Sequence, residues 1–280
     1  MIRAPATAKI NLALVVGPLR PDGKHDVATV YQRVALADRV AIEPSDTLRV
    51  VGFPADTIVR RALESLAAEA GIRPEWRARL TKRIPVAAGL GGGSSDAAVT
   101  FIGLQRLYKR PLAFERIPEV LRDLGSDVRF FTLGGRAAGV GRGDEVYKLD
   151  DASDYWVLLV DPGVMIATAE AYSWLTVPDH SNTIEGFGGQ ESSECAGDVW
   201  TNDFELPVFT RYPELAAIKE ELISLGAYRA ALSGSGSTVF GQFQMVSEAV
   251  RAGSILQKRF RVKLAKPLPR WEYFQRIVEE

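Results

Sequence analysis

The fold of this 280-residue chain is decided by one stretch, which reads Ile84-Pro85-Val86-Ala87-Ala88-Gly89-Leu90-Gly91-Gly92-Gly93-Ser94-Ser95-Asp96-Ala97-Ala98. Alternating side chains over residues 76–82 predict a strand before it that ends at the proline. Apolar residues at helical spacing up to residue 107 predict a helix after it. This order favours an anion site, because glycines let backbone N–H groups approach oxygen atoms and a helix N-terminus adds partial positive charge.

Other interpretations of the glycine loop fit the sequence less well. A flexible linker is not usually flanked by an apolar strand and a long amphipathic helix. A Walker A loop would continue with a Lys-Ser or Lys-Thr pair, and none follows the glycines. The dinucleotide fingerprint fails as well, because Gly89-x-Gly91-x-x leads to Ser94 rather than to glycine or alanine. The loop therefore predicts phosphate binding without either common motif.

The composition excludes several classes of protein. The 34 Lys and Arg balance 35 Asp and Glu, so the chain lacks the basic excess of a nucleic-acid-binding protein. No apolar run approaches the length of a membrane span, and the N-terminal residues do not form a signal peptide. Cys195 is the single cysteine, which excludes a disulfide framework and a cysteine metal site. We expect a soluble cytoplasmic protein of one large domain or two moderate ones.

An N-terminal strand carries a charged side chain where apolar residues would be expected. Residues 6–17 alternate in a way that predicts a strand with Lys9 and Asn11 on the same face. A lysine inside an apolar strand is costly unless it meets an anion. The alternative is a solvated edge strand with a snorkelling lysine.

The remaining elements follow from periodicity and from turn residues. We predict strands over 27–34, 39–42, 155–160 and 261–265, and helices over 56–70, 114–124, 168–175, 213–225 and 246–258. A turn-rich loop over 18–26 carries His25, and a polar loop is expected over 181–197. The glycine-rich residues 134–143 favour hairpin turns over a nucleotide site.

Two further segments are candidates for a catalytic or ligand-binding role. Asp127 is an acid set against an apolar segment after a glycine turn, although an ordinary helix cap or surface acid is the alternative. Late in the chain, two predicted strands flank Ser233-Gly234-Ser235-Gly236-Ser237. Such a small-residue turn is a hairpin by default and also a place where backbone can contact a ligand.

Three stretches, in this order, resemble the signatures of the galactokinase, homoserine kinase, mevalonate kinase and phosphomevalonate kinase superfamily. They are Ala8-Lys9-Ile10-Asn11-Leu12, Pro85-x3-Gly89-Leu90-Gly91-Gly92-Gly93-Ser94-Ser95 and Leu232-Ser233-Gly234-Ser235-Gly236-Ser237. The resemblance covers nearly the whole chain and implies an α+β, two-domain small-molecule kinase fold. A ribosomal-S5-domain-2-like α/β domain with the ATP loop would occupy residues 1–150, and a ferredoxin-like α+β domain residues 151–280.

Four further stretches are most similar to the branch of this superfamily that acts on a cytidine diphosphate-linked methylerythritol in the non-mevalonate isoprenoid pathway. They are Asn11-Leu12, Arg20-Pro21-Asp22-Gly23-x-His25, Leu124-Gly125-Ser126-Asp127-Val128 and Asn202-Asp203-Phe204-Glu205. The resemblance implies ATP and Mg²⁺ as cofactors and phosphorylation of a hydroxyl of this small-molecule substrate. It implies no nucleic-acid or membrane partner, and either a monomer or a homodimer.

The same resemblance implies roles for individual residues. Asp127 would take or orient the proton of the acceptor hydroxyl, and Lys9 would offset charge on the transferring phosphoryl group. ATP would be bound by Pro85, Val86, Ala87, Ala88, Gly89, Leu90, Gly91, Gly92, Gly93, Ser94 and Ser95, with Ser95 also a metal ligand. The substrate would be bound by Asn11, Lys24, His25, Tyr31, Tyr172, Ser233, Gly234, Ser235 and Gly236.

At two positions the chain departs from the branch. Lys24 stands where members usually carry a tyrosine that stacks on cytosine, and Asp56 stands where they often carry an asparagine. One alternative is a superfamily kinase for another small alcohol, of the homoserine or mevalonate type. Another is a non-catalytic nucleotide-binding member, which should lack Lys9 and Asp127. A serine hydrolase is disfavoured because there is no Gly-x-Ser-x-Gly elbow.

Overall fold

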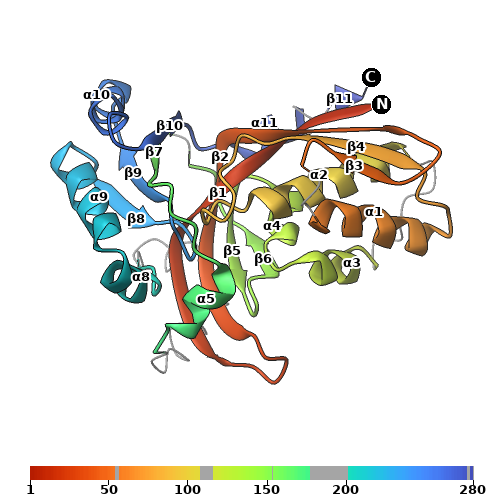
Figure 1. Cartoon of the computed structure of the whole chain (residues 1–280), viewed down its shortest axis with the longest axis horizontal. Helices are drawn as coiled ribbons and strands as arrows, with labels where there is room; N and C mark the ends of the chain where they lie inside the picture. The colour runs from red at the N-terminus through yellow and green to blue at the C-terminus, as the bar shows by residue number, and fades with distance from the viewer. Residues whose placement is uncertain (54–56, 108–115, 153, 177–200, 276–277, 280) are drawn as a thin grey trace.

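Two β-sheets with helices packed on them make up the described part of the chain (Figure 1). The computed structural model describes residues 1–53, 57–107, 116–152, 154–176, 201–275 and 278–279. One sheet has seven strands, in the order β11 (Val278–Glu279), β1 (Ile2–Leu19), β2 (His25–Pro44), β4 (Trp76–Thr81) and β3 (Arg49–Val51), with β5 (Arg136–Val140) paired to β2 and β6 (Glu145–Lys148) paired to β5. The other sheet has four strands, in the order β10 (Arg261–Ala265), β7 (Trp156–Asp161), β9 (Val239–Phe243) and β8 (Arg229–Leu232). The mixture of helices and sheets confirms the predicted α+β class.

A long antiparallel hairpin forms the backbone of the first sheet. It consists of β1 (Ile2–Leu19) and β2 (His25–Pro44), with the predicted turn between them. The separate strands predicted over 27–34 and 39–42 are wrong, because β2 runs through both without a break. A register shift between Thr7 and Ala8 accommodates the intervening residues as a bulge, so the strand bends instead of ending.

The predicted strand, glycine loop and helix are confirmed. β4 (Trp76–Thr81) pairs with β2 and with the short β3 (Arg49–Val51), and the chain then enters the loop. Helix α2 (Gly92–Leu107) begins inside the glycine-rich stretch. The last residues of that stretch therefore form the first helical turn, where backbone N–H groups have no partner within the helix.

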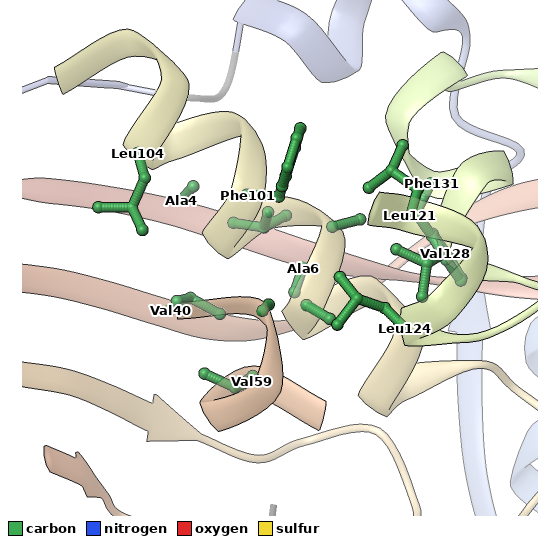
Figure 2. Close-up of a cluster of buried hydrophobic side chains, with 14 of the residues drawn as sticks. Ala4, Ala6, Val40, Val59, Phe101, Leu104, Leu121, Leu124, Val128 and Phe131 are labelled. Atoms are coloured by element: carbon green, nitrogen blue, oxygen red, sulfur yellow. The ribbon is translucent and has the colours of Figure 1, made fainter. Parts of the chain in front are cut away.

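Helices cover one face of the first sheet and fix the position of Asp127. They are α1 (Thr57–Ala70), α2, α3 (Ile117–Leu124) and α4 (Val128–Leu133). Figure 2 shows Phe101 and Leu104 of α2 in one buried cluster with Leu121, Val128 and Phe131 from the two short helices. Asp127 immediately precedes α4, so the packing of that helix decides where the carboxylate points.

The second glycine-rich patch forms a hairpin, as predicted. β5 (Arg136–Val140) pairs antiparallel with β6 (Glu145–Lys148). Gly141 and Gly143 lie in the turn with φ angles of 65° and 85°, which favour glycine.

The second sheet is entirely antiparallel among its four strands. It contains β7 (Trp156–Asp161), β8 (Arg229–Leu232), β9 (Val239–Phe243) and β10 (Arg261–Ala265). Helices α9 (Pro213–Ser224) and α10 (Val246–Leu256) pack on it through one apolar cluster. Another cluster joins the sheet to the β1–β2 hairpin, so the two sheets share a core.

Three short elements complete the described chain. α5 (Thr168–Ser173) lies close to the predicted 168–175 helix, whereas α8 (Glu205–Arg211) and α11 (Arg270–Gln275) were not predicted. The final strand β11 (Val278–Glu279) pairs with β1, so both chain ends lie together in Figure 1. The division into residues 1–150 and 151–280 stays a prediction.

Some predictions concern residues outside the described part of the chain. Asp56, Cys195 and the polar loop over 181–197 belong to this group. Within the described residues, no helix combines the length and apolarity that crossing a membrane requires.

Candidate functional site

A pocket of about 980 Å³ gathers most of the predicted site residues. Its lining includes Lys9, Asn11, Lys24, His25, Tyr31, Asp127, Tyr172, Gly234, Ser235 and residues 85–94. Ser95, Ser233 and Gly236 lie behind this surface. A pocket of similar size, about 990 Å³, lies beside α8 and α9, but none of its described lining residues was predicted for the site. Convergence of the predicted residues, rather than size, therefore selects the first pocket.

The carbonyl groups of the glycine loop are bound by other segments of the protein. Three successive carbonyls accept hydrogen bonds from the protein: Ala88 from the Thr238 N–H at 3.2 Å, Gly89 from the Ser233 hydroxyl at 3.0 Å and Leu90 from the Lys9 N–H at 3.0 Å. In a trans peptide the next N–H points the opposite way. The N–H groups of Gly89, Leu90 and Gly91 therefore point away from these three contacts, and all three residues line the pocket, an arrangement suited to anions.

The glycines were expected to let backbone N–H groups approach phosphate oxygens, and in the structure three of them also let the loop pack closely against other segments. A Cβ on Gly89 would lie 1.9 Å from the Ser233 carbonyl oxygen, and one on Gly91 would lie 2.9 Å from the Phe131 ring. A Cβ on Gly92 would contact Ile84 at 3.1 Å. At these positions protein atoms fill the space beside the glycine, so glycine lets the loop pack closely, and Gly89 and Gly91 also adopt a positive φ. Ala87 shares this geometry with a φ of 54°, which is unusual for a residue with a side chain.

The two residues predicted to be catalytic meet at the pocket wall. Lys9 Nζ lies 3.5 Å from Asp127 Oδ2, and their side chains are 5% and 29% exposed. The lysine is thus enclosed while the carboxylate opens to the pocket. The anion that Lys9 was expected to need is present, and the edge-strand alternative is excluded because Lys9 lies in a paired, buried part of β1. Asp127 occupies the residue before α4 but makes no side-chain cap to it.

Tyr31 orients the Asp127 carboxylate from the other side. Its hydroxyl donates to Asp127 Oδ1 at 3.0 Å, and its ring stacks on Phe130 with centroids 4.7 Å apart. Burial, with the nearby Asp127 carboxylate, raises the pKa of Tyr31 well above its ordinary value. The phenol therefore remains a neutral donor at physiological pH.

A chain of hydrogen bonds fixes the direction of the Lys9 ammonium. Lys9 Nζ donates to Asn11 Oδ1, Asn11 Nδ2 donates to Thr29 Oγ1 at 2.8 Å, and Thr29 donates to the Ala13 carbonyl at 2.7 Å. Lys9 and Asn11 lie on the same face of β1, as predicted. Asn11 thus acts on Lys9 as well as lining the pocket.

One part of the pocket lining is aromatic. The rings of His25 and Tyr172 stack with centroids 5.5 Å apart, and Tyr172 meets Phe204 edge-on at 4.9 Å. His25 Nδ1 lies 2.9 Å from the Gly17 carbonyl, which can only accept, so Nδ1 carries a proton and Nε2 is left for a ligand. Burial and the Asp127 charge raise the pKa of Tyr172 to about 12. Lys24, the residue before His25, also lines the pocket.

The late serine and glycine turn packs directly on the glycine loop. Besides the Ser233–Gly89 contact, Gly234 comes so close that an added Cβ would lie 3.2 Å from Lys9 Nζ. Asn202 Nδ2 holds this turn by donating to the Leu232 carbonyl at 2.8 Å and to the Gly234 carbonyl at 2.9 Å. The turn between β8 and β9 is therefore both a hairpin and a wall of the site.

Ser95, the predicted metal ligand, is fully buried at the start of α2. Its Oγ has no hydrogen-bond partner among the described residues. Those residues contain no group of three or more His, Cys, Asp or Glu side chains placed to hold a metal, and Asp127 is the single carboxylate that lines the described pocket. This donor set fits a metal ion bound mainly by phosphate oxygens rather than by a protein cage.

The structure also adds residues that were not predicted. Lys82, Arg142 and Thr168 line the pocket, and Asn202 supports its wall. Arg142 belongs to the second glycine-rich patch, which was interpreted only as a hairpin. Asn202 stood in a quoted stretch without an assigned role. Its buried position and two acceptors could be recognised only after the strands of the second half had been placed.

Comparisons with known proteins agree with this geometry. The family model described as GHMP kinases N terminal domain matches residues 57–135, and the model described as GHMP kinases C terminal matches residues 185–262. A protein of Geobacter metallireducens named 4-diphosphocytidyl-2-C-methyl-D-erythritol kinase is 41% identical over 254 residues, which cover 87% of this chain and 90% of the relative. A protein of Solibacter usitatus with the same name is 39% identical over 90% of this chain and 84% of its own.

Solved structures show the same relationship. A crystal structure of 4-(cytidine 5'-diphospho)-2C-methyl-D-erythritol kinase superposes with a TM-score of 0.79 at 31% identity, and it covers 94% of this chain and 98% of its own. A homoserine kinase from Cytophaga hutchinsonii has a TM-score of 0.69 at 14% identity over 95% and 96% of the two chains, which shows a shared fold alone.

Proposed function

Because the chain belongs to the GHMP kinases and, within them, to the family of 4-diphosphocytidyl-2-C-methyl-D-erythritol kinases, we propose that it transfers the γ-phosphoryl group of ATP to a hydroxyl of the methylerythritol unit of 4-diphosphocytidyl-2-C-methyl-D-erythritol. This is a step of the non-mevalonate route to isoprenoid precursors. The observation that carries the proposal is the Lys9–Asp127 pair, which lies in the pocket that the glycine loop also lines.

The loop and the start of α2 would bind the phosphates of ATP. The N–H groups of residues 89–91 supply directional donors, and the helix N-terminus adds favourable electrostatics. Phosphoryl transfer needs little covalent chemistry from the protein, because positioning and charge neutralisation lower most of the barrier. A rigid loop tied to β1 and to the 233–237 turn is suited to this work.

Asp127 would accept the proton of the acceptor hydroxyl or orient that hydroxyl toward phosphorus. Lys9 and Tyr31 hold the two carboxylate oxygens in place, so the group presents a fixed lone pair to the pocket. The Lys9 charge also favours the negative charge that spreads over the transferring group. Both residues are present and lie 3.5 Å apart at the pocket, which supports a catalytic rather than a non-catalytic member of the family.

Mg²⁺ bound to the ATP phosphates would neutralise their charge when it is present. Ser95 is the protein ligand suggested by the sequence, and its hydroxyl has no hydrogen-bond partner among the described residues, but it is fully buried and does not line the pocket, so phosphate oxygens would supply most of the ligands. We also infer a cytoplasmic enzyme that works as a monomer or a homodimer, in keeping with the small, charged substrate and the bacterial relatives.

The cytidine end of the substrate would lie against His25 and Tyr172. His25 Nε2 can accept from the exocyclic amine of cytosine, and the Tyr172 ring offers an aromatic surface. Lys24 and Arg142 line the same pocket and can attract the diphosphate. With Lys24 in the usual tyrosine position, base stacking would fall to Tyr172 rather than to residue 24.

Turnover tests this assignment against the alternative of another small alcohol. The purified chain with ATP and Mg²⁺ should convert 4-diphosphocytidyl-2-C-methyl-D-erythritol, and it should leave homoserine and mevalonate unchanged in parallel reactions. A His25→Ala variant should raise the KM for the cytidyl substrate and leave the KM for ATP unchanged. Turnover of homoserine or mevalonate in preference to the cytidyl substrate would refute the specificity.

A further inference from the structure

A buried ion cluster lies directly beneath the glycine loop, outside the catalytic pair. Lys82 Nζ donates to Asp96 Oδ2 at 2.6 Å and to Asp38 Oδ2. Both carboxylate side chains are fully buried, and the lysine side chain is 15% exposed. Burial alone would lower the pKa of Lys82. The charges of Asp96 and Asp38 outweigh burial and raise this pKa above its ordinary value, so the lysine remains protonated.

The cluster connects three elements around the loop. Asp38 belongs to β2, Lys82 follows the end of β4, and Asp96 lies in the first turns of α2. Asp38 Oδ1 also accepts the backbone N–H of Ile84 at 2.8 Å and that of Arg83. One carboxylate thus fixes the chain just before the loop, and Lys82 links that point to the helix just after it.

We propose that Asp38, Lys82 and Asp96 form a clamp that closes both ends of the loop, and that Asp38 and Asp96 are positioning residues for the phosphates of the nucleotide. The inference rests on the proposed nucleotide site. The aligned N–H groups of residues 89–91 depend on the relative placement of the loop ends, and errors of about 1 Å in such groups can cost about a hundredfold in rate. The clamp removes that freedom at both ends.

The net negative charge of the cluster allows an experiment to distinguish positioning of the loop from a long-range electrostatic effect on phosphate binding. Two carboxylates and one ammonium leave an excess of negative charge near a loop that faces anions. Replacing either acid by its amide removes negative charge, so long-range electrostatics alone would strengthen phosphate binding. Loss of the clamp predicts the opposite, because an amide cannot form the ion pair with Lys82 and the loop ends become free to separate. The direction of the change therefore identifies the mechanism.

The test uses the full chain with Asp38→Asn and Asp96→Asn. We expect the Kd for ADP, measured by calorimetry, and the KM for MgATP to rise by about tenfold or more in Asp38→Asn, and less in Asp96→Asn. The KM for the acceptor should stay within about twofold. Asp96→Asn keeps the backbone contacts of Asp38, so it carries the test if Asp38→Asn fails to fold.

Asp151 provides a matched control. Its carboxylate also accepts two backbone N–H groups, from Arg136 at 2.9 Å and Arg270 at 2.8 Å, but it lies at the junction of β5 and α11. Asp151→Asn should lower the melting temperature and leave the Kd for ADP unchanged. Folded Asp38→Asn and Asp96→Asn proteins that bind ADP as tightly as the parent, or more tightly, would overturn the clamp. A parent chain that binds no ADP would overturn the nucleotide site itself, and the clamp with it.

Discussion

At the scale of single residues, the site depends on how two partners share one carboxylate. Lys9 approaches one oxygen of Asp127 and Tyr31 donates to the other. The remaining lone pairs face the pocket, since the Asp127 side chain is 29% exposed whereas Lys9 is almost fully enclosed. A carboxylate held in this way is oriented and accessible, which are the properties that a proton acceptor or orienting group needs.

Asp127→Asn should lower kcat by about 10²- to 10⁴-fold, because the amide cannot accept the hydroxyl proton. The Kd for ADP should remain within about twofold, since Asp127 is not part of the loop that faces the phosphates. Asp123→Asn is the control, because Asp123 is an exposed acid of the neighbouring α3. A near-normal kcat in Asp127→Asn would remove Asp127 from the mechanism.

Tyr31→Phe should lower kcat by about tenfold to a hundredfold, since a hydrogen bond to a charged group contributes about 1.5–3 kcal/mol. The phenyl ring keeps the stacking on Phe130, so the fold should be retained. Steady-state kinetics with both substrates would show the effect in kcat and not in the KM for ATP. Tyr147→Phe, at an exposed position on β6, should change neither quantity. Equal kinetics for the two variants would contradict the orienting role.

At the scale of elements, the glycine loop is held by its neighbours. Its carbonyls bond to β1, to the β8–β9 turn and to the start of β9, and this fixes the direction of the N–H groups. Two glycines have positive φ because the loop must turn sharply while it packs against Ser233 and Phe131. The function of the loop therefore depends on strands that are distant along the chain.

Gly89→Ala should weaken ADP binding by at least about tenfold, because the added Cβ would lie 1.9 Å from the Ser233 carbonyl oxygen and push the two loops apart. Calorimetric titration with ADP measures this loss. Gly71→Ala distinguishes the effect of the Ser233 contact from the effect of backbone strain. Gly71 also has a positive φ (+64°), but a Cβ there meets nothing within 4 Å. That variant should lose about 1–2 kcal/mol of stability and keep its ADP affinity. An ADP affinity of Gly89→Ala equal to that of the parent chain would show that the close contact with Ser233 is dispensable.

At the scale of the whole molecule, the β1–β2 hairpin joins both sheets and both halves of the site. One apolar cluster lies between the hairpin and helices α1–α4, and another lies between the hairpin and the second sheet. Thr201 and Asp203 also connect the second half of the chain to the hairpin, because each forms a backbone hydrogen bond with Leu14. The pocket is bounded by segments from both halves of the chain, so its shape depends on the stability of the complete fold.

Stability should fall at alkaline pH. Burial raises the pKa of Tyr172 to about 12, and it also raises the pKa values of Tyr31 and Tyr155. Below about pH 10 these phenols are protonated in the folded and unfolded states alike, so their ionisation does not affect stability. Above that pH only the unfolded state loses the protons, and the free energy of unfolding decreases as the pH rises toward the folded-state values.

Urea denaturation at about pH 8 and about pH 11 would measure the contribution of Tyr172. The parent chain should lose more stability between pH 8 and pH 11 than Tyr172→Phe, by about 1.4 kcal/mol, because pH 11 lies only one unit above the pKa of an unfolded tyrosine. Tyr147→Phe serves again as the exposed control. Identical pH dependence in the parent and in Tyr172→Phe would contradict the raised pKa.

Much of the fold followed from local patterns. The strand, loop and helix around residues 76–107 and most elements of the second half were predicted, because hydrophobic periodicity and turn residues act over short distances. The break predicted within β2 was wrong, because a bulge lets one strand absorb residues that interrupt the alternation. The helices α8 and α11 were missed because tertiary packing stabilises such short segments.

Local sequence was enough to predict the glycine loop, the shared face of Lys9 and Asn11, and a candidate acid at residue 127. These properties depend on residue type and on neighbours along the chain. The tertiary structure alone decided that Tyr31 and Lys9 hold opposite oxygens of Asp127, that Asn202 supports the β8–β9 turn, and that Lys82 joins Asp38 to Asp96. Each of these contacts joins segments that are far apart in sequence, so no local pattern can encode it, and only the packing of the sheets and helices brings the partners within bonding distance.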